Sequence, residues 1–217
     1  MANTLYIGTR RYSSWSLRGW LAVRLAGLEV DEVVIPLAGG STAAVKALNP
    51  GGTVPYLEHD GNLIWDSLAI CEYCAEIAPA LWPLDRAARS HARVIASEMH
   101  AGFRALRQAM PMSLFRELPA SNGATAEVVE DVTRIEEIWR GARDRFGNGG
   151  VFLFGAGFGN ADAMYAPVVA RFLTYRPTLS ADSRAYCDAV RAHPLVAAWY
   201  EAAADEPAEW RLAQYEA

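Results

Sequence analysis

Three serines stand within four residues near the start of the chain, in the stretch SSWS at residues 13–16. The stretch separates a short apolar run at residues 5–8 from a segment with helical periodicity at residues 16–26. Hydroxyls at the start of a helix can cap its first backbone N–H groups. They can also donate a hydrogen bond to an external thiolate, which the positive end of the helix stabilises further. The residue types leave both interpretations open.

A second feature is the run Thr53-Val54-Pro55, where a proline begins a predicted strand. Proline cannot donate to a strand ladder. A cis bond before Pro55 would turn the backbone N–H and C=O of Val54 towards an extended peptide. The alternative is an ordinary trans proline at a strand edge.

Asp66 and Ser67 open another predicted helix. A helix N-terminus with a serine hydroxyl can hold a carboxylate, and an aspartate can pair with an ammonium group. Together the two residues suit the headgroup of an amino acid. The alternative is a plain N-cap, because both residue types are favoured there.

Cys71 and Cys74 form a Cys-x-x-Cys pair, but the pair lies inside a predicted helix. A redox pair belongs at a helix N-terminus, where the thiolate is stabilised. A zinc site needs four ligands, and the sequence offers no second Cys or His pair with matching spacing. We therefore expect two packed thiols and no metal.

Strand and helix patterns alternate in the first third of the chain. Predicted strands lie at residues 5–8, 33–37, 54–58 and 62–65, and Asp60-Gly61 marks a hairpin turn between the last two. Predicted helices lie at residues 16–26, 41–48 and 67–78. The order β-α-β-α-β-β-α is that of a thioredoxin-like α/β domain, which we assign to residues 1–80.

Only helical patterns follow the apolar connector at residues 79–84. Predicted helices lie at residues 87–110, as one long helix, and at 127–146, 162–174, 183–192 and 195–204. The sequence therefore predicts an all-α C-terminal domain at residues 87–217.

The composition is that of a globular protein, with 52% hydrophobic residues in a chain of 217. A net charge of −5 argues against nucleic acid or an anionic membrane as a partner. No apolar stretch is long enough to span a membrane, and the N-terminus does not read as a signal peptide. Three cysteines, an odd and sparse number, indicate reduced thiols and a cytoplasmic location.

Taken in order, these features resemble the glutathione transferase family. The matching motifs are Ser13-Ser14-Trp15-Ser16-Leu17-Arg18, Asn49-Pro50 with Thr53-Val54-Pro55, Asp66-Ser67-Leu68-Ala69-Ile70-Cys71-Glu72-Tyr73, Ala161-Asp162-Ala163 and His193-Pro194. The resemblance spans nearly the whole chain and looks most like the zeta class and related bacterial serine-type enzymes. It implies a homodimer, glutathione as cosubstrate, no metal, and a role in detoxification.

The resemblance also implies how glutathione is held. Pro55 would be cis, with Val54 pairing its backbone with the cysteinyl part of glutathione beside Thr53. Asp66 and Ser67 would hold the γ-glutamyl end.

For the sulfur, the resemblance implies that Ser13 donates to the glutathione thiolate. Ser14, or a backbone N–H near Trp15, is the second choice. A tyrosine-type mechanism through Tyr6 or Tyr12 is a minor alternative.

The small electrophilic substrate would lie between this loop and the first helices of the second domain. Met99 and Phe103 would line an apolar pocket there, and Arg104 and Arg107 would meet an acidic substrate. The alternatives are core packing for the apolar pair and a solvated helix face for the arginines.

The chain departs from zeta enzymes that isomerise maleylacetoacetate. Trp15 stands where they carry a cysteine, and Arg107-Gln108-Ala109 replaces their Gln-Asn-Leu. We therefore expect glutathione conjugation or a related thiolate reaction, with isomerisation as one alternative. A glutathione-binding regulatory or scaffold protein with little catalysis is the other.

Overall fold

The computed structural model describes residues 3–38 and 42–216. Its first part is a four-stranded sheet in the order β2-β1-β3-β4, with β1 (Thr4–Gly8), β2 (Asp31–Ile35), β3 (Tyr56–His59) and β4 (Asn62–Ile64). Strand β1 runs parallel to β2 and antiparallel to β3, and β3 and β4 form the predicted hairpin. The predicted order of strands along the chain is confirmed, although β2 begins two residues earlier than the pattern indicated.

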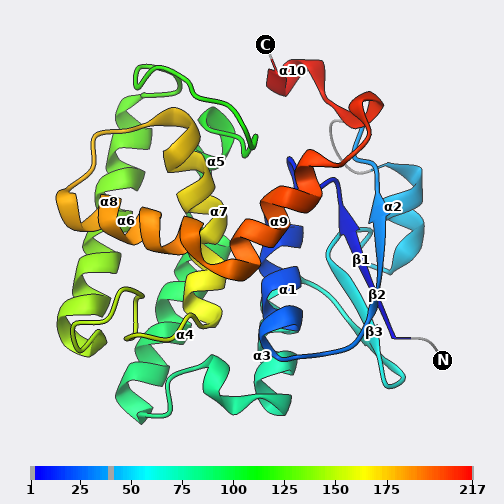
Figure 1. Cartoon of the computed structure of the whole chain (residues 1–217), viewed down its shortest axis with the longest axis horizontal. Helices are drawn as coiled ribbons and strands as arrows, with labels where there is room; N and C mark the ends of the chain where they lie inside the picture. Colours follow the sequence, from blue (N-terminus) through cyan, green and yellow to red (C-terminus); the bar gives the residue numbers. More distant parts are fainter. Residues whose placement is uncertain (1–2, 39–41, 217) are drawn as a thin grey trace.

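Three helices complete this α/β unit: α1 (Ser14–Leu25), α2 (Ala43–Leu48) and α3 (Ser67–Ile77). Helices α1 and α3 lie between the sheet and the later helices, whereas α2 lies on the far side of the sheet (Figure 1). The predicted start of the second helix, Ser41, lies outside the described residues.

The rest of the described chain is helical, as predicted. Its elements are η1 (Pro79–Leu81), α4 (Arg86–Ala101), α5 (Arg104–Ala109), α6 (Ala126–Phe146), α7 (Asn160–Tyr175), α8 (Ala181–Ala192), α9 (Pro194–Ala204), η2 (Ala208–Trp210) and α10 (Ala213–Glu216). Of the helices in the described part of the chain, none is long and apolar enough to cross a membrane.

The expectation of one helix over residues 87–110 is wrong. Helix α4 ends at Ala101, and Phe103 takes a left-handed conformation with φ 58° before α5 begins. The guanidinium of Arg107 donates to the carbonyls of Met99 and His100, which lie in the last turn of α4. These bonds satisfy acceptors that a continuing helix would have used. The periodicity concealed the break, because a single glycine inside a helical pattern is usually tolerated.

Helix α7 is buried along almost its whole length and packs against α1, α4 and α8. Two of its polar side chains donate to backbone carbonyls of neighbouring helices. Asn160 Nδ2 donates to Cys71 O of α3 at 2.9 Å, and Tyr165 OH donates to Ile95 O of α4 at 3.1 Å. The α/β unit and the helical unit are therefore joined by specific bonds as well as by apolar packing.

The cysteines are free thiols in the core. Cys71 and Cys187 are buried with Cys74, and burial raises the pKa of Cys74 to about 12. The same cause raises the pKa of Cys71 well above its ordinary value. Neutral buried thiols are poor nucleophiles, so the structure agrees with the packing interpretation of the Cys-x-x-Cys pair.

Asp162 holds the loop that leads into α7. Its carboxylate accepts from Leu153 N at 3.1 Å, from Gly159 N at 3.0 Å and from Tyr186 OH at 3.0 Å. Asp162 is only 1% exposed, and burial raises its pKa to about 6 although the three donors act in the opposite direction. One carboxylate therefore ties the loop before α7 to α8.

We expect Asp162→Ala to lower the free energy of unfolding by about 3 kcal/mol or more, because three buried donors lose their acceptor. Urea unfolding followed by circular dichroism measures this change. Asp182→Ala is the matched control, since Asp182 is an exposed aspartate in the first turn of α8. Equal losses in the two variants would contradict this role for Asp162.

Candidate functional site

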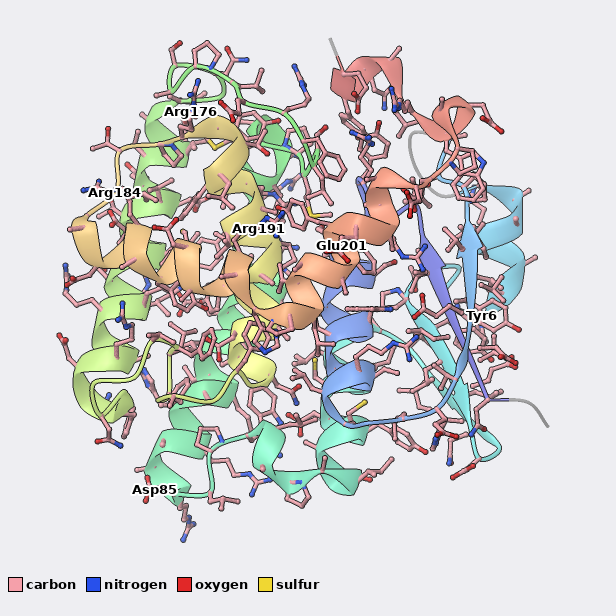
Figure 2. All side chains as sticks on the ribbon, viewed as in Figure 1. Tyr6, Asp85, Arg176, Arg184, Arg191 and Glu201 are labelled. Atoms are coloured by element: carbon pink, nitrogen blue, oxygen red, sulfur yellow. The ribbon has the colours of Figure 1, made fainter. Side chains whose placement is uncertain are left out.

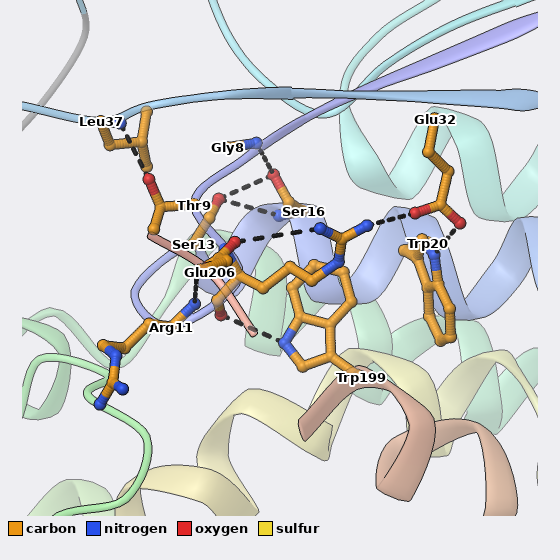
Figure 3. Close-up of polar contacts among 11 residues, drawn as sticks. Gly8, Thr9, Arg11, Ser13, Ser16, Trp20, Glu32, Leu37, Trp199 and Glu206 are labelled. Atoms are coloured by element: carbon orange, nitrogen blue, oxygen red, sulfur yellow. Dashed lines mark hydrogen bonds and ion pairs between the residues drawn. The ribbon is translucent and has the colours of Figure 1, made fainter. Parts of the chain in front are cut away.

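The loop before α1 is fixed by groups from the C-terminal part of the chain (Figure 3). The Glu206 carboxylate accepts from Arg10 N at 2.6 Å and from Arg11 N at 3.3 Å. Trp199 Nε1 of α9 donates to Arg10 O at 3.1 Å. The loop that carries the serines is therefore positioned by residues nearly two hundred positions away in the sequence.

Ser13 is the N-cap of α1. Its Oγ accepts from Ser16 N at 3.3 Å and donates to Ser16 Oγ at 2.7 Å, and Ser16 Oγ in turn accepts from Gly8 N at 2.9 Å. Ser13 is 5% exposed. Its hydroxyl proton is engaged inside the protein, so the structure gives Ser13 the capping role that the residue types had left open.

Ser14 is the first residue of α1 and is half-buried. Its Oγ accepts from Arg171 Nη2 of α7 at 3.3 Å. A serine hydroxyl has one proton and two acceptor lone pairs. The bond from Arg171 occupies a lone pair and leaves the proton of Ser14 available to an outside acceptor.

The side chains of Tyr6 and Tyr12, the two tyrosines considered as thiolate donors, contact other groups of the protein. Tyr6, on β1 at the sheet side of the molecule (Figure 2), stacks on Tyr56 with ring centroids 5.5 Å apart. Tyr12 OH donates to Glu216 Oε1 at 2.6 Å and accepts from Leu212 N at 3.0 Å. Burial and the neighbouring carboxylate raise the pKa of Tyr12 to about 12. Both tyrosine side chains therefore have partners within the protein.

A cavity of about 410 Å³ lies beside the first turns of α1 and α3. It is lined by Trp15, Gly51, Thr53, Val54, Pro55, Trp65, Asp66, Ser67 and His100. Six of these residues come from the three motifs that the sequence singled out, and the Val54–Pro55 bond is cis. The lining does not include Ser13 or Ser14, which precede Trp15 in the chain.

The start of α3 presents two polar groups at this cavity. Asp66 is its N-cap, with Oδ1 accepting from Leu68 N at 2.9 Å. Ser67 is fully buried, and its Oγ has no hydrogen-bond partner. A buried polar group without a partner costs free energy. Ser67, one of the lining residues, therefore has an unused hydroxyl at the cavity.

Sequence reasoning missed His100, which enters the cavity from α4. Its Nε2 lies 3.3 Å from Asp66 Oδ2, and its ring lies edge-on to Trp15 at 5.2 Å between centroids. Burial lowers the pKa of His100, Asp66 raises it, and the positive charges of Arg18 and Arg107 lower it further. No local pattern pointed to His100, since it joins the site only through the packing of α4 on α3.

Trp15 contacts two guanidinium groups through its ring. The Cζ atoms of Arg18 and Arg107 each lie 4.7 Å from its ring centroid. Arg18 is 1% exposed, its Nε and Nη1 have no hydrogen-bond partner, and burial lowers its pKa to about 9. Stacking on the electron-rich indole face stabilises both cations.

The predicted substrate-pocket residues are not brought together. Met99 and Phe103 are buried in the hydrophobic core, at 1% and 7% exposure, so packing accounts for them. Arg104 is exposed on α5. Arg107 is the exception, because its guanidinium lies against Trp15 while also bonding the end of α4.

Comparisons with known proteins cover most of the chain. Residues 12–77 match the model of the glutathione S-transferase N-terminal domain, and residues 97–202 match that of the C-terminal domain. A "Probable maleylacetoacetate isomerase" of Caenorhabditis elegans is 34% identical over 137 residues, which cover 61% of this chain and 64% of that protein. The "Maleylacetoacetate isomerase" of Rattus norvegicus is 29% identical over 185 residues, 81% of each chain.

Solved structures share the fold. A glutathione transferase homologue from Burkholderia, with bound glutathione, superposes with a TM-score of 0.71 at 19% identity, over 95% of this chain and 100% of that one. A theta class enzyme from Xanthomonas axonopodis pv. citri, with glutathione bound, gives 0.65 at 24% identity over 90% and 95% of the two chains.

We expect Ser13→Ala to lower the free energy of unfolding by about 1–2 kcal/mol, because α1 loses its side-chain cap. Ser14→Ala keeps the cap and should lower stability less. Urea unfolding of both variants beside the parent protein measures the difference. An equal or larger loss in Ser14→Ala would show that the structural role belongs to the second serine.

Proposed function

Because the chain belongs to the glutathione S-transferase family, we propose that it binds glutathione in the cavity beside α1 and α3 and activates the glutathione thiol as a nucleophile. The observation that carries the proposal is the convergence of three separate motifs on one cavity of about 410 Å³, with an unpartnered buried serine at its edge. A cavity of this size suits a small ligand.

The γ-glutamyl end is assigned to the start of α3. The Ser67 hydroxyl and the first backbone N–H groups of α3 would receive the carboxylate, since helix N-termini favour anions. Asp66 would pair with the ammonium group through Oδ2, the oxygen that now faces His100. The backbone of Val54, which lines the same cavity, is assigned to the cysteinyl part.

The thiolate is assigned to Ser14 rather than Ser13. Ser13 donates to Ser16 and caps α1, whereas the proton of Ser14 is available. A hydrogen bond to the charged form lowers the pKa of a thiol, and each unit of that shift corresponds to about 1.36 kcal/mol. The thiolate would then attack an electrophilic carbon or a peroxide. The homodimer, the cytoplasmic location and the role in detoxification are parts of the same proposal.

A maleylacetoacetate-type isomerase is the second candidate. It is favoured by the names of the two relatives reported above. It is opposed by Trp15, an indole in contact with two guanidiniums at the position where the isomerases that this chain resembles carry a cysteine. A glutathione-binding protein with little turnover is the third reading.

We expect Ser67→Ala to raise the Kd for glutathione about tenfold or more, because a hydrogen bond to a charged carboxylate is lost. Isothermal titration calorimetry measures the affinity. Ser90→Ala, on the exposed side of α4, is the matched control and should bind like the parent protein. An unchanged Kd in Ser67→Ala would remove the start of α3 from the proposed site.

A turnover screen separates the three functions. Glutathione is supplied with an aryl halide, an epoxide, a peroxide and a maleyl compound, and both product and remaining thiol are measured. Conjugation or peroxide reduction consumes glutathione, and we expect at least one of these. Isomerisation of the maleyl compound with no loss of thiol would favour the second candidate. Tight binding without turnover of any compound would favour the third.

A further inference from the structure

Arg171 is a buried arginine of α7 that reaches across the domain junction to α1. It is 5% exposed. Its Nε donates to Met110 O at 2.9 Å, its Nη1 to Pro167 O at 3.0 Å and its Nη2 to Ser14 Oγ at 3.3 Å. The bonds to the two backbone carbonyls hold the guanidinium in place, and the third bond is made to Ser14.

The bond from Arg171 makes Ser14 Oγ an acceptor and leaves the hydroxyl proton to another partner. Arginine has donors and no acceptor, so the contact can only be N–H to Oγ. Ser14 cannot donate back to Arg171, and its own proton must point elsewhere. Ser13 is the contrast, because its proton is directed to Ser16 Oγ.

The surroundings of Ser14 carry excess positive charge. Burial lowers the pKa of Arg18, Arg107 and Arg171. Arg18 also feels Arg107 and Arg171 as like charges, and Arg171 feels Arg107. None of the three forms an ion pair among the described residues. An anion beside Ser14 would relieve this repulsion.

The other titratable groups nearby are few. Asp131 acts on Arg107 from α6. Tyr175 acts on Arg171 from its own helix, and Cys71 and Tyr165 act on Arg18. His100 and Asp66 lie on the cavity side of Trp15. Among these, Asp66 and Asp131 are the carboxylates, and neither forms an ion pair with Arg171.

We propose that Arg171 is the positioning residue of the thiolate site: it holds Ser14 Oγ so that the serine proton is directed at the sulfur of bound glutathione. Arg18 and Arg107, whose guanidiniums lie over the ring of Trp15, add positive charge nearby. The thiol proton leaves to solvent, the sulfur keeps the electron pair, and no protein group has to accept the proton. This inference rests on the proposed function, because it needs glutathione in the cavity.

The test measures the pKa of the bound glutathione thiol from thiolate absorbance near 240 nm as a function of pH. Arg171→Met and Ser14→Ala should each raise that pKa by about one unit. Arg171→Lys keeps the charge but loses the planar fork, so its rise should be smaller than that of Arg171→Met. Arg86→Met, at the exposed start of α4, controls for loss of one positive charge and should leave the pKa unchanged.

The double variant Ser14→Ala with Arg171→Met tests whether the arginine acts through the serine. Adding Arg171→Met to Ser14→Ala should then raise the pKa by less than half of the rise it causes alone. Binding of S-methylglutathione, which has no ionisable thiol, should change by less than about twofold in each variant that folds. A merely structural role would alter this affinity without shifting the thiol pKa.

Two results would overturn the inference: a thiol pKa in Arg171→Met equal to that of the parent protein, or fully additive shifts in the double variant. If Arg171→Met does not fold, Arg171→Lys decides, and an unchanged pKa there counts against the inference. Failure of the parent protein to bind glutathione at all would refute the proposed function instead, so the two failures are distinguishable.

Discussion

Helix α1 packs against helices of both the α/β unit and the helical unit. The candidate site depends on this packing, because it sets the position of α1. Its residues from Ser16 to Val23 are buried, and it packs against both α3 and α7. The position of its first turn follows from this packing. Two hydrogen bonds then fix the chain just before Ser14: Gly8 N donates to Ser16 Oγ, and Arg10 N donates to the Glu206 carboxylate.

Two helix N-termini meet at the cavity, those of α1 and α3. Both carry partial positive charge, and the arginines behind Trp15 add to the positive charge around α1. Asp66 supplies the opposing negative charge, with His100 beside it. A ligand with anionic groups and one ammonium group matches this distribution, and that is the charge pattern of glutathione. Electrostatics and shape therefore support the same ligand.

Trp15 links the wall of the cavity to two arginine side chains. It forms part of the cavity wall and at the same time stacks on two guanidiniums. One of these cations, Arg18, is only 1% exposed. The side chain at position 15 therefore contributes both to the cavity wall and to the packing of a buried charge beside it.

The sequence by itself determined the order of strands and helices, the hairpin at Asp60-Gly61 and the motifs that line the cavity, because these depend on periodicity, turn residues and short-range capping. It misjudged the helix over residues 87–110, since the break at Phe103 depends on bonds from Arg107 to the carbonyls of α4. Local pattern also could not choose between the two serines, and it gave no hint of His100 or Arg171. Only the tertiary structure decided that Ser13 caps α1, that His100 lines the cavity and that Arg171 bonds Ser14. These contacts depend on which helix packs against which, and α7 meets α1 across more than 150 residues of chain.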